Sequence, residues 1–448
     1  MMAYGSPGHR TAIALFLVAA LFGWPHTVSA EEAAAVDPES SPSPQNGDDS
    51  AEKSTPTPAA TPSGPLSKLR VHGFLTQAFA TGSFQKGRFP AADGSPAGPT
   101  PEELALGIPE SGTTDYRNAA IQFRYEITPK DILIVQLSSR ALGDSPIDAS
   151  EDEIELDWAL YERRLGDHTS LKVGRVLIPY GIFNEIRDVG TLLPFYRPAF
   201  VFYREGSFTT ETVDGLLVSH TFFPESDWRL EANLYFGEWD LVEIDPFTET
   251  ALPARSEDSF GSQFWLNTPI YGLRFGLGTQ RRNIVDGAEG IVRPPGGSNR
   301  FDEWLASVDA VFDRWVARAE YRTFKNDAAF FPAFGAPDFV AEFPSYYVQL
   351  GIHPTQKFRV YLQAEVSKFN VQTVVFTEPQ KFTEREDVGI AFNYLFGPNV
   401  VLKAEYHQVS GNDQGFLPVF TPAGLRLQPI FSDLDDGDYT IVSLSASF

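Results

Sequence analysis

The feature that most constrains this chain is an alternation of apolar and polar residues with a period of two, which is clearest at its C-terminal end. From Asp438 to Phe448 the sequence reads DYTIVSLSASF, so that Val442, Leu444 and Ala446 fall on one side of a strand and serines fall on the other. Successive side chains of a strand point to opposite faces of a sheet. An apolar face opposite a serine face suits lipid on one side and water on the other. A half-buried strand of a soluble sandwich is the alternative for this segment taken alone.

The N-terminal part of the chain predicts export and a flexible leader. Residues 1–30 read as a cleaved signal peptide, because Arg10 precedes an apolar run from Ala12 to Trp24, and the small residues of VSA precede Glu31. Residues 31–68 are rich in Pro, Ser, Thr, Ala and acids, so they predict a disordered periplasmic tether. The tether is either a plain spacer or an attachment to the cell wall or a periplasmic partner. A transmembrane barrel is expected over residues 69–448.

Composition excludes several classes of protein. The chain has no cysteine, which excludes a lipoprotein anchor, disulfides, zinc–thiolate sites and a thiol nucleophile. A formal net charge of -24 argues against nucleic acid as a partner. The sequence contains no GxSxG or HExxH, and its histidines are scattered, so we expect neither an enzyme nor a cofactor. The acidic run from Ser432 to Asp438 lacks the twelve-residue frame of a calcium loop and is expected to be a solvated loop.

From Leu69 onward the alternation predicts an all-β, 16-stranded antiparallel transmembrane barrel with long extracellular loops and short periplasmic turns. On the strand near residue 362, for example, Val360, Leu362 and Ala364 oppose Tyr361 and Gln363. A charge that faces hydrocarbon at the midplane of a membrane costs about 2–4 kcal/mol, so consistent segregation indicates that one face has no access to water. The polar face is therefore expected to line a lumen.

Connections between the expected strands alternate between short and long. The short connections carry turn-forming residues and are the expected periplasmic turns: Thr128 to Asp131, Gly166 to Asp167, Pro224 to Ser226, Thr268 to Ile270, Asp313 to Arg314, Pro354 to Thr355 and Gly397 to Asn399. The long connections are the expected extracellular loops: Thr81 to Asp115, Gly143 to Asp152, Ile178 to Phe208, Glu238 to Ser259, Arg282 to Arg300, Phe324 to Pro344, Asn370 to Glu386 and Gly411 to Asp436. Seven turns and eight loops join sixteen strands.

Aromatic residues beside the turns predict a girdle at the periplasmic interface: Phe222, Phe223, Trp228, Phe312, Trp315, Phe358, Phe396 and Phe448. Two expected strands fit the pattern less well. Between Leu171 and Leu177, Arg175 falls on the lipid side unless a bulge intervenes or the residue lies above the membrane. From Thr212 to Thr221 the two faces differ little, so the register there is not determined by the pattern.

The third loop, Ile178 to Phe208, predicts a constriction. About sixteen strands enclose a channel too wide for side chains to fill, and this loop is too apolar for open water. With its apolar side on the barrel wall, its charges would face the pore axis. These candidate constriction residues are Glu185, Arg187, Asp188, Arg197, Arg204 and Glu205. A surface loop packed on its neighbours or on another subunit is the alternative.

The inward faces of the expected strands also carry many charges. The arginines expected on the lumen wall are Arg124, Arg140, Arg229, Arg274, Arg318, Arg322 and Arg359. The acids expected beside them are Glu126, Glu155, Asp157, Glu231, Asp309, Glu320, Glu365 and Glu405. Such a wall can orient dipolar solutes in a transverse field. The same residues can instead form cross-strand ion pairs that stiffen the wall.

Three segments resemble a known family. GRVLIPYGIFNEIRD from Gly174 to Asp188, FGSQFWLNTPIYGLRFGLG from Phe260 to Gly278, and VHGFLTQAF near the first strand are similar to segments of proteobacterial porins of the phosphate-selective porin O/P superfamily. The resemblance implies a bacterial outer-membrane location, a homotrimer with outer-membrane lipid and lipopolysaccharide around it, and a third loop inside the lumen. The terminal Phe448 resembles the sorting signature of outer-membrane proteins, which implies the barrel assembly machinery as a partner.

Together these features predict a porin that forms a water-filled channel for passive diffusion of small hydrophilic solutes and ions, with a lean toward anions. The third loop balances three arginines with three acids and has no lysine, which favours a broad small-solute channel over phosphate specificity. The alternative is a non-conducting binding or adhesion barrel that acts through its extracellular loops, with Thr81 to Asp115 and Gly411 to Asp436 as the candidates.

Overall fold

The structure is a computed structural model that describes most of the chain beyond residue 63. The described residues are 64–83, 106–146, 154–203, 211–245, 250–286, 299–328, 339–373, 380–411, 416–421, 424–429 and 437–448. The chain divides into two units, Met1–Ser63 and Gly64–Phe448. The expected signal peptide and the tether up to residue 63 lie outside the described residues, and the end of the tether includes the short helix η1 (Pro65–Lys68).

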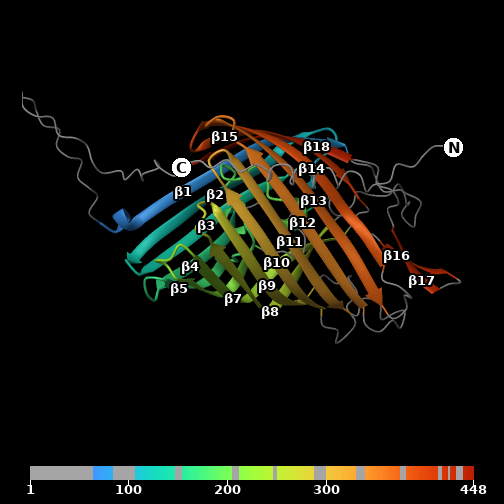
Figure 1. The fold of residues 1–448 in the computed structure, drawn as a ribbon, viewed down its shortest axis with the longest axis horizontal. Coiled ribbons are helices and arrows are strands. Elements are labelled where there is room, and N and C mark those ends of the chain that lie inside the picture. The colour runs from blue at the N-terminus through green and yellow to red at the C-terminus, as the bar shows by residue number, and fades with distance from the viewer. Residues whose placement is uncertain are drawn as a thin grey trace, which may run out of the picture. The chain divides into compact units, whose positions relative to one another are not determined.

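Sixteen strands of the second unit close into one antiparallel barrel (Figure 1), which confirms the predicted fold class. The barrel strands are β1 (Leu69–Ser83), β2 (Thr113–Thr128), β3 (Asp131–Leu142), β4 (Glu155–Arg164), β5 (Thr169–Leu177), β6 (Thr212–Phe222), β7 (Arg229–Asp245), β8 (Thr250–Asn267), β9 (Leu273–Asp286), β10 (Asn299–Val311), β11 (Trp315–Ala328), β12 (Phe339–Ile352), β13 (Phe358–Thr373), β14 (Gln380–Gly397), β15 (Val400–Ser410) and β18 (Gly437–Ser447). β16 (Phe416–Thr421) and β17 (Gly424–Pro429) form a separate two-stranded sheet. Among the described residues, no helix is long and apolar enough to cross a membrane.

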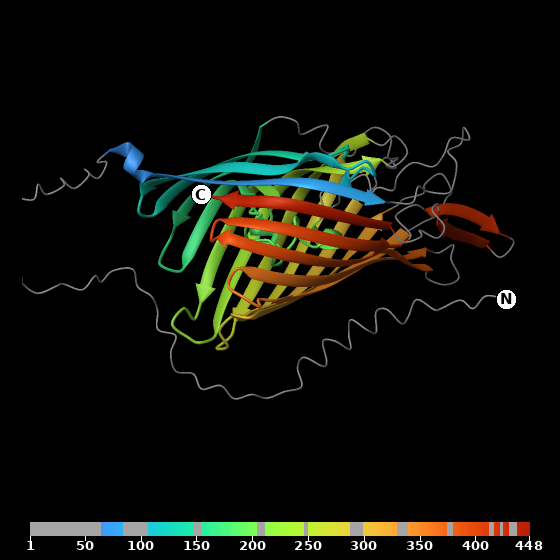
Figure 2. The same cartoon turned by 90° about the horizontal axis from the view of Figure 1, so that it is seen from above.

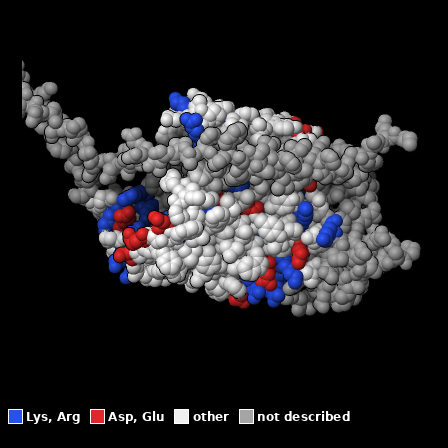
Figure 3. Space-filling view, in the orientation of Figure 1, with Lys and Arg blue, Asp and Glu red and all other residues white. Residues whose placement is uncertain are grey.

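The structure confirms which residues of these strands were predicted to face outward and which inward. On β18, Val442 and Leu444 are exposed, whereas Ser443 and Ser445 are buried on the inner side. On β13, Leu362 is exposed and Gln363 is buried. Figure 3 shows one side of the molecule, where mixed clusters of charge are separated by uncharged surface. An apolar outer surface of this kind matches lipid, because only alternate residues of a barrel strand contact it.

The C-terminal residue closes the barrel against the first strand. The backbone N–H of Phe448 donates to the carbonyl of Gly73 at 2.9 Å, and the N–H of Gly73 donates to the carbonyl of Phe448 at 3.1 Å. A Cβ atom on Gly73 would lie 2.3 Å from the ring of Phe448, so the ring covers the outer side of this glycine. The glycine at position 73 therefore leaves room for the tip of the terminal ring beside β1.

Several extracellular loops are shorter than predicted, because the strands continue past the membrane. β7 and β8 reach Asp245 and Thr250, although Glu238 to Ser259 was expected to be a loop. The same holds for the expected loops Arg282 to Arg300, Phe324 to Pro344 and Asn370 to Glu386, into which the flanking strands extend. The prediction placed each loop where the lipid-facing apolar residues stopped. In water, two paired strands keep their backbone hydrogen bonds even where they have no apolar face. These hairpins therefore continue beyond the last lipid-facing apolar residues.

The described residues of the connection between β5 and β6, 178–203 and Glu211, are called L3 below, and residues 178–203 lie inside the barrel (Figure 2). L3 contains the short helices η3 (Asn184–Ile186) and α3 (Phe200–Tyr203), and both views show this green segment within the ring of strands (Figures 1 and 2). Apolar residues of L3, among them Phe183 and Phe202, share a buried cluster with inward-facing residues of the wall. The apolar character of L3 is thus satisfied by packing in the lumen.

Candidate functional site: the constriction in the lumen

Carboxylates on the wall hold the backbone of L3. The N–H of Tyr196 donates to Oε2 of Glu405 on β15 at 2.7 Å, and the N–H of Val201 donates to Oε2 of Glu365 on β13 at 2.9 Å. A third bond runs from the N–H of Ile182 to Oε1 of Glu320 on β11 at 3.1 Å. Each bond satisfies an N–H group of the loop that would otherwise be buried without a partner. These contacts come from three separate strands, so they fix L3 across a wide sector of the wall.

Cations and an amide on the wall hold carbonyl groups of the same loop. Nζ of Lys403 donates to the carbonyl of Phe195 at 2.8 Å, and Nη2 of Arg322 donates to the carbonyl of Val201 at 2.7 Å. Nδ2 of Asn393 donates to the carbonyl of Pro194 at 2.9 Å. Lys403 has no exposed surface, so its Nζ faces the loop and not the pore. Polar side chains of the wall therefore position L3 through its main chain.

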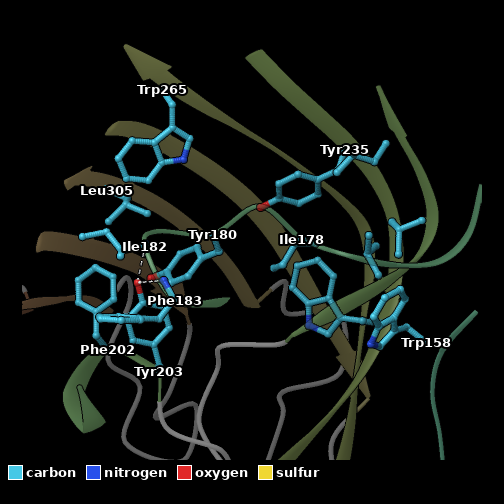
Figure 4. Close-up of a cluster of buried hydrophobic side chains, with 14 of the residues drawn as sticks. Trp158, Ile178, Tyr180, Ile182, Phe183, Phe202, Tyr203, Tyr235, Trp265 and Leu305 are labelled. Atoms are coloured by element: carbon cyan, nitrogen blue, oxygen red, sulfur yellow. Dashed lines mark hydrogen bonds between the residues drawn. The ribbon is translucent and has the colours of Figure 1, made fainter. Parts of the chain in front are cut away.

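An aromatic cluster fills the space between L3 and the wall (Figure 4). Tyr180, Phe183, Phe202 and Tyr203 come from L3, and Trp265 comes from the wall. The hydroxyl of Tyr203 accepts N–H groups of Ile182 at 2.9 Å and Phe183 at 3.2 Å and donates to Glu320. Aromatic side chains bury large areas and pack edge to face. The loop is thus part of a solid core on this side of the lumen.

A cavity of about 30 Å³ remains between L3 and strands β1 to β3. The residues that line it are Thr76, Asn118, Arg140, Leu142, Arg187, Asp188, Gly190, Tyr196, Arg197, Pro198, Phe200 and Tyr203. About 10–15 Å³ of such volume holds one water molecule, so the cavity has room for about two. L3 approaches the wall closely at Gly190, where a Cβ atom would lie 2.1 Å from Oγ1 of Thr76. Only glycine allows this approach, and we define the cavity with its lining as the constriction.

The charges of the constriction form a network. Oδ1 of Asp188 accepts from Nη2 of Arg140 at 3.0 Å and from Nδ2 of Asn118 at 3.1 Å. Nη2 of Arg187 donates to the carbonyl of Tyr203 at 2.9 Å, and its Nε lies 3.7 Å from Oε2 of Glu211. Oxygen atoms of Asp157, Asp188 and Glu211 lie within 4.8 Å of one another. Because Arg140 and Arg187 contact these acids, the protein itself supplies their counter-charges.

Burial shapes the charge of Glu211, which lies in L3 just before β6. Burial and the nearby carboxylate of Asp188 hold the pKa of Glu211 well above its usual range. A carboxyl group with a raised pKa keeps its proton at pH values where an exposed glutamate is ionised. The acids of the constriction therefore carry less negative charge than their number implies.

The remaining arginine of the constriction is enclosed by rings. Cζ of Arg197 lies 5.5 Å from the ring centre of Tyr116 and 5.9 Å from those of Tyr196 and Phe200. Its guanidinium also donates to the hydroxyl of Tyr116, whose own hydroxyl donates to the carbonyl of Leu106 at 2.8 Å. A guanidinium held over aromatic faces keeps its charge with few water contacts. Arg197 thus places a fixed positive charge at the cavity.

The candidate constriction residues have different environments. Arg187, Asp188 and Arg197 line the cavity together. Glu185 is exposed, and it does not line this cavity. Arg204 and Glu205 lie outside the described residues.

The wall arginines also separate into groups. Arg140 lines the constriction, whereas Arg322 is buried beneath L3 with 5% of its surface exposed. Arg274 and Arg318 both pair with Asp309 at 2.9 Å, and Arg229 pairs with Glu231 at 3.2 Å. The remaining two, Arg124 and Arg359, are half-buried.

Sequence reasoning missed the anchors Lys403 and Asn393, and it missed Glu211 and Asn118 at the constriction. Lys403 and Asn393 fall on inward-facing positions of their strands, so the alternation alone could have found them. Their role as anchors depends on the path of L3, which has no periodic signal. Glu211 lies just beyond the expected end of the third loop and could be found only from the loop's position.

Comparisons with known proteins agree on the fold. The sequence matches no family model and no curated protein. The fold is similar to that of OmpT, an outer membrane protein of Vibrio cholerae, with a TM-score of 0.50, 10% identity, and coverage of 85% of this chain and 97% of that chain. It is similar to OmpF of Salmonella typhi in complex with daunomycin, with a TM-score of 0.50, 12% identity, and coverage of 85% and 97%. An anion-selective porin from Comamonas acidovorans has a TM-score of 0.46, 10% identity, and coverage of 85% and 99%.

At these identities the likeness shows the fold alone. A closed sixteen-stranded barrel with an apolar exterior is an outer-membrane fold, so the predicted location in the bacterial outer membrane is confirmed. The phosphate-selective porin O/P superfamily stays a prediction.

Proposed function

We propose that this chain forms a narrow outer-membrane channel for the passive passage of small hydrophilic solutes and ions, with a preference for anions. One observation carries the proposal: L3 packs against the wall inside the lumen, and a cavity of about 30 Å³ lined by three arginines remains between it and strands β1 to β3. A cavity of this size favours ions and small solutes over larger molecules. The channel works without catalysis, since passage needs only a polar path across the membrane.

The charge at the cavity supports the preference for anions. Its lining contains Arg140, Arg187 and Arg197, against the single carboxylate of Asp188. The raised pKa of Glu211 further reduces the negative charge nearby. An ion responds mainly to charges at the narrowest and least screened point of its path. The negative charge of the whole chain therefore counts for less than these arginines.

A non-conducting barrel is the second candidate, and the packing of L3 favours it. L3 contacts Thr76 on β1, Arg140 on β3, Glu320 on β11 and Glu405 on β15, so it reaches widely separated parts of the wall. A barrel closed by such a loop would act through its extracellular surface.

Conductance in a planar bilayer separates the two candidates. We expect small single-channel steps for the purified protein and a severalfold larger conductance after removal of Gly190 to Ala199. A reversal potential across a salt gradient then gives the selectivity, which should be on the anion side. A protein that does not conduct, and a loop deletion that folds and conducts no better, would favour the non-conducting barrel.

The proposed assembly is a homotrimer embedded in outer-membrane lipid and lipopolysaccharide. The proposed route to the membrane is the barrel assembly machinery, with Phe448 as part of its signal. Deletion of Phe448 should leave the protein in the periplasm, because the ring and backbone of Phe448 join β18 to β1. Undiminished heat-modifiable barrel in the outer membrane of the deletion variant would contradict this role.

A further inference from the structure

The end of the first extracellular loop is folded into the barrel and packs on L3. We call residues 106–112, which directly precede β2, the L1 end. Leu106 has no exposed surface and Ile108 is buried, and both share a buried cluster with Tyr196 and Phe200 of L3. Inward-facing residues of β1, β2, β3, β15 and β18 complete this cluster. The L1 end therefore covers L3 from the side on which the extracellular loops lie.

Two glycines fix the path of the L1 end. Gly107 has a φ of +64°, and its carbonyl accepts the N–H of Asp144 at 2.9 Å. Gly143, with a φ of +62°, approaches so closely that a Cβ atom on it would lie 2.3 Å from the carbonyl oxygen of Gly107. Residues other than glycine rarely adopt such φ values. The L1 end is thus held against the start of the second loop as well as against L3.

Two consecutive hydrogen bonds join the L1 end to the constriction. The hydroxyl of Tyr116 donates to the carbonyl of Leu106 at 2.8 Å, and the guanidinium of Arg197 donates to that hydroxyl. A hydroxyl has one proton to donate and lone pairs that accept. Because the proton is given to the L1 end, a lone pair faces Arg197. We call this pair of bonds the Tyr116 link.

The ring of Tyr116 does not explain the link, because a phenylalanine would make the same ring contacts. Tyr116 has no exposed surface, and its ring lies 4.9 Å from the ring of Tyr196 and 5.5 Å from Cζ of Arg197. Without the hydroxyl, the carbonyl of Leu106 would lose the donor that Tyr116 supplies. A buried polar group that loses its partner destabilises the folded state. The hydroxyl is therefore the group that ties the loop to the charge.

We propose that Tyr116 positions Arg197, and that the L1 end thereby helps to set the selectivity of the channel. Arg197 lines the constriction. Its partner in the Tyr116 link is a neutral hydroxyl, which holds the guanidinium without cancelling its charge, whereas Arg140 is bonded to the carboxylate of Asp188 at 3.0 Å. A movement of the L1 end is passed to Arg197 through one side chain. The inference rests on the anion preference of the proposed function.

Thiol accessibility tests the Tyr116 link without transport. Because the chain has no cysteine, Leu106→Cys and Ser111→Cys each provide one thiol, at a buried and at an exposed position of the L1 end. Attachment of a maleimide-linked polyethylene glycol is read as a mass shift on a gel. Combined with Tyr116→Phe, Leu106→Cys should react about tenfold faster, because loss of a buried hydrogen bond shifts the docking equilibrium by about this factor. Ser111→Cys should react equally fast with and without Tyr116→Phe.

Reversal potentials test whether the link acts through Arg197. Tyr116→Phe should move the reversal potential in the same direction as Arg197→Gln, because the guanidinium is no longer held at the cavity. Combined with Arg197→Gln, it should add no further shift. The matched control is Tyr361→Phe, at another buried inward-facing tyrosine, whose hydroxyl lies 3.2 Å from Nε2 of His353. This control should leave the reversal potential unchanged, and heat-modifiable mobility establishes that each barrel is folded.

Three results would overturn the proposal. The first is equal reactivity of Leu106→Cys with and without Tyr116→Phe, and the second is an unchanged reversal potential in Tyr116→Phe. The third is a shift by Tyr116→Phe that is as large in the Arg197→Gln background as in the wild type, because Tyr116 would then act independently of Arg197. A wild type without anion preference would contradict the proposed function, and the thiol reaction would still decide whether Tyr116 holds the L1 end.

Discussion

Removal of two wall anchors should release part of L3. Glu365 and Glu405 accept the N–H groups of Val201 and Tyr196 at 2.9 and 2.7 Å, and both carboxylates are buried. Loss of its acceptor leaves a buried N–H group unsatisfied, which costs about 1–3 kcal/mol for each group. If the two losses add, Glu365→Ala with Glu405→Ala weakens docking by about 2–6 kcal/mol. This raises the population of undocked loop by about thirtyfold to ten-thousandfold, because each 1.4 kcal/mol is a factor of ten.

Single-channel recording tests this expectation. The double alanine variant should show larger and noisier openings than the wild type, since an undocked segment no longer fills the lumen. The matched control is Glu365→Gln with Glu405→Gln, because each amide oxygen still accepts the N–H group of the loop. Heat-modifiable mobility establishes that both barrels are folded. Unchanged conductance of a folded double alanine variant would refute the view that these carboxylates keep L3 in the lumen.

Three further results are expected. The anion preference should fall as the pH is raised through the elevated pKa of Glu211, because ionisation of Glu211 adds negative charge at the constriction. A wild type without pH dependence, or a Glu211→Gln variant with the same dependence as the wild type, would contradict this. Arg197→Gln should move the reversal potential toward cation preference. The control Lys130→Gln, in a periplasmic turn, removes one positive charge as well and should leave the reversal potential unchanged. Equal shifts of the reversal potential in both variants would show that total charge governs permeation. Gly73→Val should impair assembly, because its side chain overlaps the ring of Phe448 and displaces that ring from β1. Full assembly of Gly73→Val would speak against the contact.

The barrel could be predicted from the sequence because its main signal is local. Alternation on one strand assigns an inner and an outer face without knowledge of any other strand. The two faces of β18, with Ser445 inside and Leu444 outside, follow directly from this rule. The ends of the extracellular hairpins could not be located, because a strand above the membrane no longer needs an apolar face. β7 and β8 are the clearest case, since their pairing continues to Asp245 and Thr250.

The chemistry of the site was harder to predict. The alternation along a strand places a charged residue inside the barrel, but it does not tell which residues that side chain contacts there. Arg140 and Arg322 both fall on inward positions. Arg140 lines the constriction, whereas Arg322 is covered by L3 and bonded to its main chain. The difference depends on contacts between residues more than a hundred positions apart in sequence, such as Arg322 and Val201. No periodicity within either segment encodes such a contact.

The anchoring of L3 through its main chain has a consequence for how the channel can change. Asn393 and Lys403 bind the carbonyl groups of Pro194 and Phe195, which every residue type supplies. Glu405 binds the N–H group of Tyr196, which every residue type but proline supplies. The position of the loop and the chemistry that it shows to a solute are thus specified by different residues. Side chains such as that of Arg197 can be exchanged while the scaffold holds the loop in place. A family of selectivity filters is therefore accessible from one barrel by substitutions within L3 alone.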